Sequence, residues 1–227
     1  MILSNRLKVI VDYVDFGQRV LDIGTDHGFV PIFLAKHKGA KYIVASDISK
    51  NSLEKSRDEI LRLKLQENIF LRLGNGLEVV EKGEVDTVII AGMGGYLIKN
   101  LLVEELEKVK SLDKLILQPM QNSEVLREYL YKNKFEIISE KIIYEDGRYF
   151  EIIVSKYGKD NSNIDEIYYE IPKKLLDEKD ETLKNYLKYK INNLKEIIKK
   201  IKVNSKENKK LIEIENKIKF YEGLLWK

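Results

Sequence analysis

Cysteine is absent from all 227 residues, which excludes disulfides and thiolate metal sites and suits a reducing compartment. Histidine occurs only at His27 and His37, so few ligands remain for a transition metal, and we expect no bound metal. Apolar runs stay well short of the roughly 20 residues that a membrane span needs. The first residues also lack the apolar run of a secretory signal. The sequence therefore predicts a soluble, cytoplasmic protein that does not bind a membrane.

Arginine is absent from the last third of the chain, where lysine is abundant. Residues 157–227 hold 17 lysines and 13 acidic side chains, whereas residues 1–156 hold 23 basic and 24 acidic side chains. A lysine-rich tail beside a nearly neutral domain fits the delivery of a polyanion to an active site. A solvated helix face explains the same charge equally well.

Short apolar runs alternate with helical patterns over the first two thirds of the chain. This rhythm indicates a parallel sheet with helices on both faces, and right-handed crossovers make it doubly wound. Two β-rich runs, 135–144 and 148–156, flank the hairpin signal Asp146-Gly147, so an antiparallel pair closes this α/β sheet. We expect strands at 19–24, 42–47, 69–73, 86–91 and 114–118, and helices at 29–38, 49–65 and 97–106.

The composition changes after residue 157. Residues 157–163 read as a linker, and two amphipathic helical patterns follow, with a turn near Asn204-Ser205-Lys206. Their apolar seams predict an antiparallel α-helical coiled-coil hairpin. We therefore expect domains at 1–157 and 158–227, and a monomer or weak dimer, since so short a seam leaves packing on the main domain or on a second copy open. The seams consist of Leu187, Leu194, Ile198 and Ile201, then Leu211, Ile214, Ile218, Tyr221 and Leu225.

The segment Asp22–Gly28 lies between the first strand and the first helix, where open parallel sheets bind ligands. Its glycines, Gly24 and Gly28, let the backbone approach a ligand. The fingerprint G-x-G-x-x-G is missing because Asp26 replaces its second glycine, which disfavours a nicotinamide dinucleotide. Asp22 suits an ammonium group, and Asp47 at the next strand tip suits ribose hydroxyls. Together they predict an adenosine ligand whose far end is cationic, although a structural turn also explains the motif.

Three further loops follow the third, fourth and fifth strands. Gly74-Asn75-Gly76 places Asn75 for contact with an adenine edge, or is simply an Asn-Gly turn. The glycines of Ala91-Gly92-Met93-Gly94-Gly95 are entropically expensive, so we expect something to approach that loop closely. Gln118-Pro119-Met120-Gln121 adjoins it, or its proline merely ends a strand.

These motifs, together with residues 145–151 (Glu-Asp-Gly-Arg-Tyr-Phe-Glu), resemble the bacterial tRNA (adenine-22 N1)-methyltransferase family. The resemblance runs in order from Leu3 to the C-terminus, and Asp26-His27-Gly28 is its most discriminating part. It implies a class I, Rossmann-like methyltransferase fold, S-adenosyl-L-methionine as cofactor and tRNA as substrate. The lysine-rich hairpin has no residue-by-residue counterpart, which leaves its role toward tRNA open.

The expected site residues follow from these motifs and this resemblance. We expect cofactor contacts from Asp22, Gly24, Thr25, Gly28, Asp47, Ile48, Gly74, Asn75, Gly76, Ala91, Gly92 and Met93. We expect substrate contacts from Arg6, Gly94, Gln118, Arg148 and Tyr149, with Tyr13, Phe29 and Tyr96 as further stacking candidates, although aromatic residues in such places usually belong to the core.

Adenine N1 carries its own lone pair, so methylation there needs positioning and electrostatics rather than a strong base. Asp26 is the catalytic candidate that accepts a hydrogen bond from the exocyclic amine; alternatively it holds the amino group of the cofactor while Asp22 fixes the loop. His27 orients the cofactor or the base, or is a helix-terminal residue bonded to backbone. A small-molecule or protein acceptor, and a scaffold without catalysis, are the other hypotheses.

Overall fold

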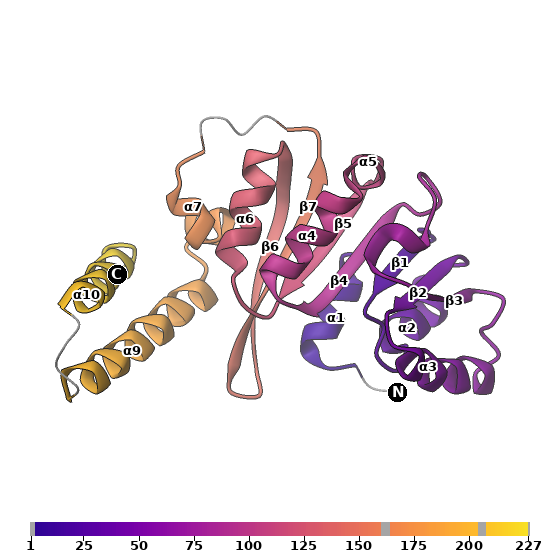
Figure 1. Ribbon diagram of the computed structural model, residues 1–227, viewed down its shortest axis with the longest axis horizontal. Coiled ribbons are helices and arrows are strands. Elements are labelled where there is room, and N and C mark those ends of the chain that lie inside the picture. Colours follow the sequence, from indigo (N-terminus) through magenta and orange to yellow (C-terminus); the bar gives the residue numbers. More distant parts are fainter. Residues whose placement is uncertain (1–2, 160–163, 204–207, 227) are drawn as a thin grey trace. The chain divides into compact units, whose positions relative to one another are not determined.

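The computed structural model describes residues 3–159, 164–203 and 208–226, and the chain divides into two compact units, Met1–Ile171 and Pro172–Lys227 (Figure 1). The first unit holds the sheet and its covering helices. The second holds three helices. Among the described residues, no helix has the length and apolar character needed to cross a membrane.

One sheet of seven strands organises the first unit, in the order β3-β2-β1-β4-β5-β7-β6. Five of these strands run parallel: β1 (Val20–Ile23), β2 (Ile43–Asp47), β3 (Ile69–Leu73), β4 (Thr87–Met93) and β5 (Lys114–Pro119). A hairpin of β6 (Phe135–Glu145) and β7 (Arg148–Tyr157) closes the sheet, with β7 antiparallel to both β5 and β6. The predicted Rossmann-like sheet and its closing hairpin are confirmed.

Helices cover both faces of this sheet (Figure 1). One face packs against α4 (Gly95–Glu104), α5 (Leu106–Val109) and α6 (Ser123–Lys132), together with the 3₁₀ turn η1 (Gly76–Val79). The other face packs against α1 (Asn5–Asp12), α2 (Phe29–His37) and α3 (Lys50–Arg62).

Successive strand residues divide between the two layers, as the pleat requires. In β4, Val88 and Ile90 join the core beneath α4 and α6, whereas Ile89 joins the core beneath α1 and α2. All three side chains are fully buried. Burial on both sides explains why the strands read as continuous apolar runs rather than as alternating ones.

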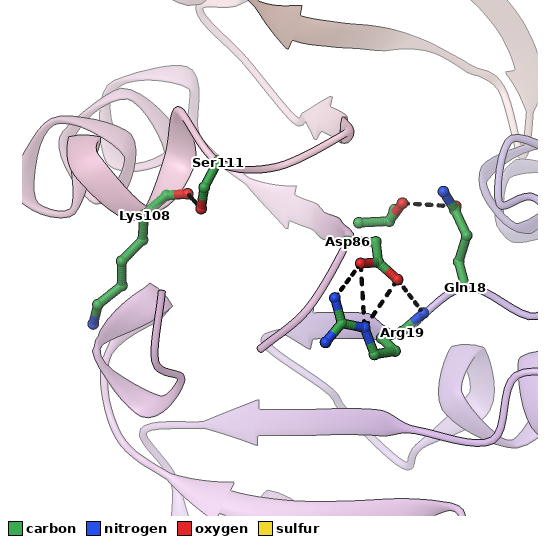
Figure 2. Close-up of polar contacts among 6 residues, drawn as sticks. Gln18, Arg19, Asp86, Lys108 and Ser111 are labelled. Carbon is green, nitrogen blue, oxygen red and sulfur yellow. Dashed lines mark hydrogen bonds and ion pairs between the residues drawn. The ribbon is translucent and has the colours of Figure 1, made fainter. Parts of the chain in front are cut away.

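Polar contacts close the amino edge of the sheet (Figure 2). Asp86, just before β4, accepts hydrogen bonds from the Nε of Arg19, at 3.1 and 3.2 Å, and from its backbone N–H at 3.0 Å. Gln18 accepts a bond from the Thr87 hydroxyl at 2.7 Å. At this edge the polar side chains bind one another. In a separate part of Figure 2, the Ser111 hydroxyl donates to the Lys108 carbonyl at 2.7 Å.

The structure contains helices that the sequence patterns did not predict. Neither α1 nor α6 was expected, and both bury apolar residues against the sheet. The first unit also continues past the boundary expected at 157/158. Tyr168 and Tyr169 of α7 (Ile167–Glu170) pack against the core, and the Tyr169 ring lies 6.2 Å from that of Tyr131. Residues 164–171 therefore belong with the sheet.

The second unit contains α8 (Lys173–Asp177), α9 (Glu181–Val203) and α10 (Asn208–Gly223). Lys195 of α9 pairs with Glu222 of α10 at 2.9 Å, whereas Lys184 lies over the ring of Trp226, so the two long helices run antiparallel. The expected turn at Asn204-Ser205-Lys206 lies outside the described residues, as does most of the expected linker. The antiparallel pair agrees with the sequence, and its coiled-coil packing stays a prediction.

Candidate functional site

A pocket of about 420 Å³ lies at the carboxyl edge of the sheet, above β1 and β4. It is lined from β1 and the loop after it, from the start of α2, from the end of β4 and from the N-terminal segment that leads into α1. The lining residues are Ser4, Arg6, Leu7, Asp22, Gly24, Thr25, Asp26, Phe29, Val30, Ala91 and Gly92. Eight of these were expected at the site, Phe29 among them as a stacking candidate, so the structure brings distant parts of the predicted set together.

Backbone hydrogen bonds fix the loop after β1 to β2. The N–H groups of Gly24 and Thr25 both donate to the Ser46 carbonyl of β2, at 2.8 and 3.0 Å. Gly24 has a φ of +80°, and Gly28, which caps α2, has a φ of +66°. Both values lie in the left-handed region that favours glycine. The two glycines of the motif are therefore required by the turn itself.

Asp22 is the buried carboxylate of the pocket, with only 7% of its surface exposed. Burial, opposed by Thr25 and reinforced by the charge of Asp47, raises the pKa of the Asp22 carboxyl to about 6. The Thr25 hydroxyl is near enough to act on this pKa, but it is buried without a hydrogen bond of normal geometry. A carboxylate and an unsatisfied hydroxyl side by side fit a ligand that brings hydrogen-bond donors and a positive charge.

Asp26 and His27 are the exposed part of the same loop. The His27 Nε2 lies 3.6 Å from the Asp26 carboxylate, and both side chains are substantially exposed. His27 has a φ of +60°, and its ring stacks on Phe29 with 5.4 Å between centroids. Asp26 and Phe29 line the pocket, whereas His27 lies outside the lining residues. The histidine is therefore placed to support Phe29 and Asp26 rather than to enter the pocket.

The residues expected from β2 and β3 line the carboxyl edge beside the pocket. Asp47 ends β2, where its Oδ1 accepts the Ser49 N–H at 2.8 Å, and its neighbour Ile48 is 75% exposed. Gly74 donates its N–H to the Asp47 carbonyl at 3.1 Å. These residues are not among those that line the pocket, but the charge of Asp47 reaches Asp22.

Asn75 and its neighbours behave as a structural turn. Asn75 is exposed and precedes η1, and its backbone N–H donates to the Glu78 carboxylate. A Cβ on Gly76 would meet Leu101 at 2.7 Å, so that glycine permits helix packing. The turn interpretation accounts for these contacts, and a contact between Asn75 and a cofactor stays a prediction.

Gln118 connects the end of β5 to the other parts of the site. It is fully buried, and its Oε1 accepts hydrogen bonds from Arg6 and, at 3.2 Å, from the Gly92 N–H. Its Nε2 donates to the Pro119 carbonyl at 2.9 Å. Gly92 is the extra residue of a bulge between β4 and β5, with a φ of +82°. These bonds position the Gly92 loop, and the expected contact between Gln118 and substrate stays a prediction.

The loop after β4 is equally constrained. Met93 packs its terminal methyl against Gly24, and Gly94 precedes α4. Gly95 donates its N–H to the Gln121 carbonyl at 2.8 Å. A Cβ on Gly95 would lie 2.1 Å from the Asn122 carbonyl oxygen, so the chain after β5 leaves no room for a side chain there. Gly95 therefore permits a close approach between the two loops, whereas a Cβ on Gly92 would meet nothing within 4 Å and one on Gly94 would make only an ordinary contact with Gln121.

Arg6 joins the N-terminal helix to the hairpin. Its guanidinium lies 5.2 Å from the centroid of the Phe150 ring and binds Gln118. Burial lowers the pKa of Arg6, and Glu145 partly offsets that effect. Glu145 itself accepts the Asn5 N–H at 2.6 Å. Arg6 lines the pocket, where its guanidinium contacts Gln118 and the Phe150 ring, and its expected contact with substrate stays a prediction.

The hairpin tip carries the remaining expected residues. Arg148 is exposed, and Tyr149 is half-buried with its ring 4.8 Å from that of Tyr144. Sequence patterns did not single out Tyr144, although an aromatic residue beside an Asp-Gly turn was the available signal. Tyr13 lies elsewhere: it bonds Ser139, and its carbonyl accepts from Lys114 at the start of β5.

The residues present fit a cofactor with a cationic end and an adenosine, since Asp22 and Thr25 offer a buried charge and an unused hydroxyl beside a glycine turn. Within the described part of the chain, no three His, Cys, Asp or Glu side chains gather as metal ligands.

Comparisons with known proteins agree with this geometry. Residues 3–153 match the family model described as a methyltransferase domain. The tRNA (adenine(22)-N(1))-methyltransferase of Bacillus subtilis is 35% identical over 165 residues, which cover 73% of this chain and 69% of that protein. The crystal structure of the B. subtilis m1A22 tRNA methyltransferase TrmK has a TM-score of 0.87 at 28% identity and covers 99% of each chain. Mycoplasma capricolum TrmK, solved with S-adenosyl-homocysteine, has a TM-score of 0.83 at 27% identity and covers 98% of this chain and 97% of its own.

Proposed function

The chain belongs to the bacterial tRNA (adenine-22 N1)-methyltransferase family, and we propose that the pocket above β1 and β4 is the place where it works. The enzyme transfers a methyl group from S-adenosyl-L-methionine to N1 of adenine 22 in tRNA. The observation that carries the location is the buried Asp22 carboxylate beside the unsatisfied Thr25 hydroxyl, at a glycine turn between the first strand and its helix.

The residues of β1 and β2 hold the cofactor, which supplies a methyl group on a cationic sulfur. Asp22, when ionised, binds the ammonium group, and Gly24 and Gly28 let the backbone approach. Asp47 ends β2 and Ile48 follows it directly. From this position the Asp47 carboxylate accepts hydrogen bonds from the ribose hydroxyls, and the exposed Ile48 side chain covers the adenine ring. The position of Asp47 agrees with the rule that open parallel sheets bind ligands at the carboxyl ends of their strands.

The residues after β4 and β5 receive the base. Gly92 and Gly94 provide an approach without side chains, and Gln118 fixes the Gly92 backbone through the 3.2 Å bond. Water is excluded and N1 is aligned with the methyl group, so that orientation supplies most of the rate.

Asp26 is the carboxylate that accepts a hydrogen bond from the adenine amine. Asp26 lines the pocket and is exposed, which supports contact with the arriving base, whereas Asp22 is buried. A negative charge there offsets the positive charge of the N1-methylated product. His27, stacked on Phe29, orients this loop.

The test uses the purified chain, tritium-labelled S-adenosyl-L-methionine and unmodified tRNA transcripts with A or G at position 22. We expect label in the A transcript alone. Asp26→Asn then lowers the rate of transfer by at least about 100-fold, with cofactor affinity preserved. Loss of cofactor affinity in Asp26→Asn would instead give Asp26 the amino group of the cofactor, and label in both transcripts would remove the assignment to position 22.

The same proposal places the enzyme in the cytoplasm with its tRNA, as a monomer or weak dimer that uses no metal. Equilibrium sedimentation and activity in the presence of a chelator test the last two points.

A further inference from the structure

The β6–β7 hairpin extends past the rest of the sheet at the carboxyl edge (Figure 1). The last β5 residue paired with β7 is Leu117, opposite Ile153. From Ile152 to Arg148, β7 is paired with β6 alone. At about 3.4 Å per residue, the hairpin tip stands roughly 17 Å beyond that last pair. The hairpin is thus a projection on the side of the sheet where the bulge at Gly92 and the β5 end meet.

Two aromatic side chains stand opposite one another near the tip of this projection. Tyr144 and Tyr149 are directly paired across the hairpin, with 4.8 Å between ring centroids and 49° between ring planes. Tyr144 is 58% exposed. Single exposed apolar side chains are ordinary on protein surfaces. A pair gathered on one face of a projecting hairpin is a local aromatic surface.

A buried ionic network lies directly below this pair. The pairs Glu140↔Ile153, Ile142↔Glu151 and Tyr144↔Tyr149 follow one another at two-residue steps, so all share one face of the hairpin. The Arg127 side chain of α6 donates from Nε to Glu140 at 2.7 Å and from Nη2 to Glu151.

The network fastens the aromatic face to the loop after β5. The Ser123 hydroxyl donates to Glu151 at 2.7 Å, and Ser123 begins α6 immediately after the residues that touch Gly95. Arg127, Glu140 and Glu151 are all buried. Removing three charged side chains from water is unfavourable in itself. We infer that the network serves to hold the neighbouring tyrosine pair in a fixed position.

The opposite face of the hairpin is tied to the pocket. Phe150 lies against Arg6, which lines the pocket, and Glu145 accepts the Asn5 N–H. The aromatic pair is therefore held at a fixed position beside the site of methyl transfer. Arg148 is exposed at the same tip.

We propose that Tyr144 and Tyr149 form a stacking surface for an unpaired nucleotide of the tRNA strand that carries adenine 22, with Arg148 binding an adjoining phosphate. This rests on the proposed function. An aromatic face stacks any base, and an exposed arginine at the same tip, on the face that carries Glu145 and Phe150, suits the phosphodiester backbone of a strand that passes the tip. A protein partner would have no reason to dock beside the pocket that receives the base. The target base must leave its stack to be methylated, and its neighbours then need a new contact.

The test compares Tyr144→Ala and Tyr144→Phe with the wild-type chain. Because Tyr144 is exposed, both variants are expected to fold. Tyr144→Ala raises the KM for tRNA about ten-fold and leaves kcat and the Kd for S-adenosyl-L-methionine unchanged, whereas Tyr144→Phe restores the wild-type KM. Arg148→Ala reduces by about one the slope of log K for tRNA against log salt.

Phe16→Ala is the matched control, because Phe16 is an aromatic side chain, 82% exposed, that precedes β1 at the amino edge. Its KM for tRNA stays at the wild-type value. A wild-type KM in Tyr144→Ala, or an equal rise in Phe16→Ala, overturns the stacking surface while leaving the methyltransferase intact. If no transcript is methylated, the proposed function fails on its own. The stacking surface is then judged by direct tRNA binding, where equal affinity of Tyr144→Ala and wild type overturns it.

Discussion

Gly24 and Met93 touch across the carboxyl edge of the sheet: a Cβ on Gly24 would lie 2.6 Å from the Met93 Cε. The loop after β1 and the end of β4 therefore meet at one point. Since Gly24 also has a φ of +80°, two separate constraints act on the same residue.

Gly24→Ala is expected to lower the affinity for S-adenosyl-L-methionine at least about ten-fold, because the methyl group of Met93 is displaced into the pocket. The left-handed backbone alone destabilises an alanine by about 1–2 kcal/mol. Gly17→Ala is the control: Gly17 has a φ of +79° at the other edge, with nothing within 4 Å of its would-be Cβ. Isothermal calorimetry and thermal unfolding separate the two effects. Equal loss of cofactor affinity in both variants contradicts the role given to the Met93 contact.

Asp22 makes the stability of the free protein depend on pH. Its pKa is raised from 3.8 to about 6, so between these values the folded chain holds more protons than the unfolded chain. The free energy of unfolding therefore falls as pH rises from about 4 to 6, by about 3 kcal/mol in total, and this contribution is constant above that window. Urea unfolding of wild type and Asp22→Asn across this range measures the difference. Identical pH profiles would show that Asp22 is not the group responsible.

Cofactor affinity has the opposite pH dependence. In the proposed site an ionised Asp22 binds the ammonium group, so we expect the Kd for S-adenosyl-L-methionine to rise about ten-fold for each pH unit below about 6. Asp22→Asn has weak affinity at every pH and no slope. Calorimetric titrations at pH 5, 6 and 7 test this, with Asp26→Asn as the variant that retains the slope.

Gly95→Ala is expected to disturb both loops at the acceptor side. Its Cβ would lie 2.1 Å from the backbone oxygen of Asn122, and backbone cannot turn aside as a side-chain end can. We expect a loss of about 1–3 kcal/mol of stability and of most methyl transfer. Gly94→Ala is milder, because only the Gln121 side chain lies near its would-be Cβ, at 3.6 Å. Thermal unfolding ranks the two, and equal destabilisation would remove the argument from close approach.

Arg127→Met leaves two buried carboxylates without their partner. Although burial by itself lowers the pKa of Arg127, Glu151 and Glu140 raise it overall, so the guanidinium is charged throughout the accessible pH range. Its removal is expected to destabilise the chain by about 3–5 kcal/mol. Adding Glu140→Gln and Glu151→Gln restores part of this, which denaturant unfolding detects. A single variant as stable as wild type would mean that the network contributes nothing to stability.

The strands could be predicted because burial on both faces leaves a signature in the local sequence. The apolar run from Ile43 ends at Asp47 in the structure as it does in the sequence. Helix α6 escaped this kind of inference, since Arg127 interrupts its apolar positions and is nonetheless fully buried. Only the distant Glu140 and Glu151 make that burial tolerable.

Within the candidate site, residues that are close in the sequence could be predicted together, whereas contacts between distant residues could not. Asp22, Gly24 and Asp26 are close in the chain, so their spacing alone placed them in one loop. The bond between Arg6 and Gln118 joins residues 112 positions apart, and no local pattern foretells it. Both were expected to contact substrate, and those contacts stay predictions. The structure shows that the two side chains bind each other.

The order of strands has a consequence for the chain while it is being made. β7 lies between β5 and β6 but follows both in the sequence, so the outer edge of β5 has no partner until about residue 157 has been synthesised. Leu115, Ile116 and Leu117 then form an open apolar edge, the kind of template on which strands of other chains pair. The pocket-lining residues all precede this stage in the sequence, whereas Phe150, which packs against Arg6 of the pocket, does not. We expect released chains that stop before Arg148 to sediment far more than chains that continue past Tyr157, and S-adenosyl-L-methionine to reduce that difference.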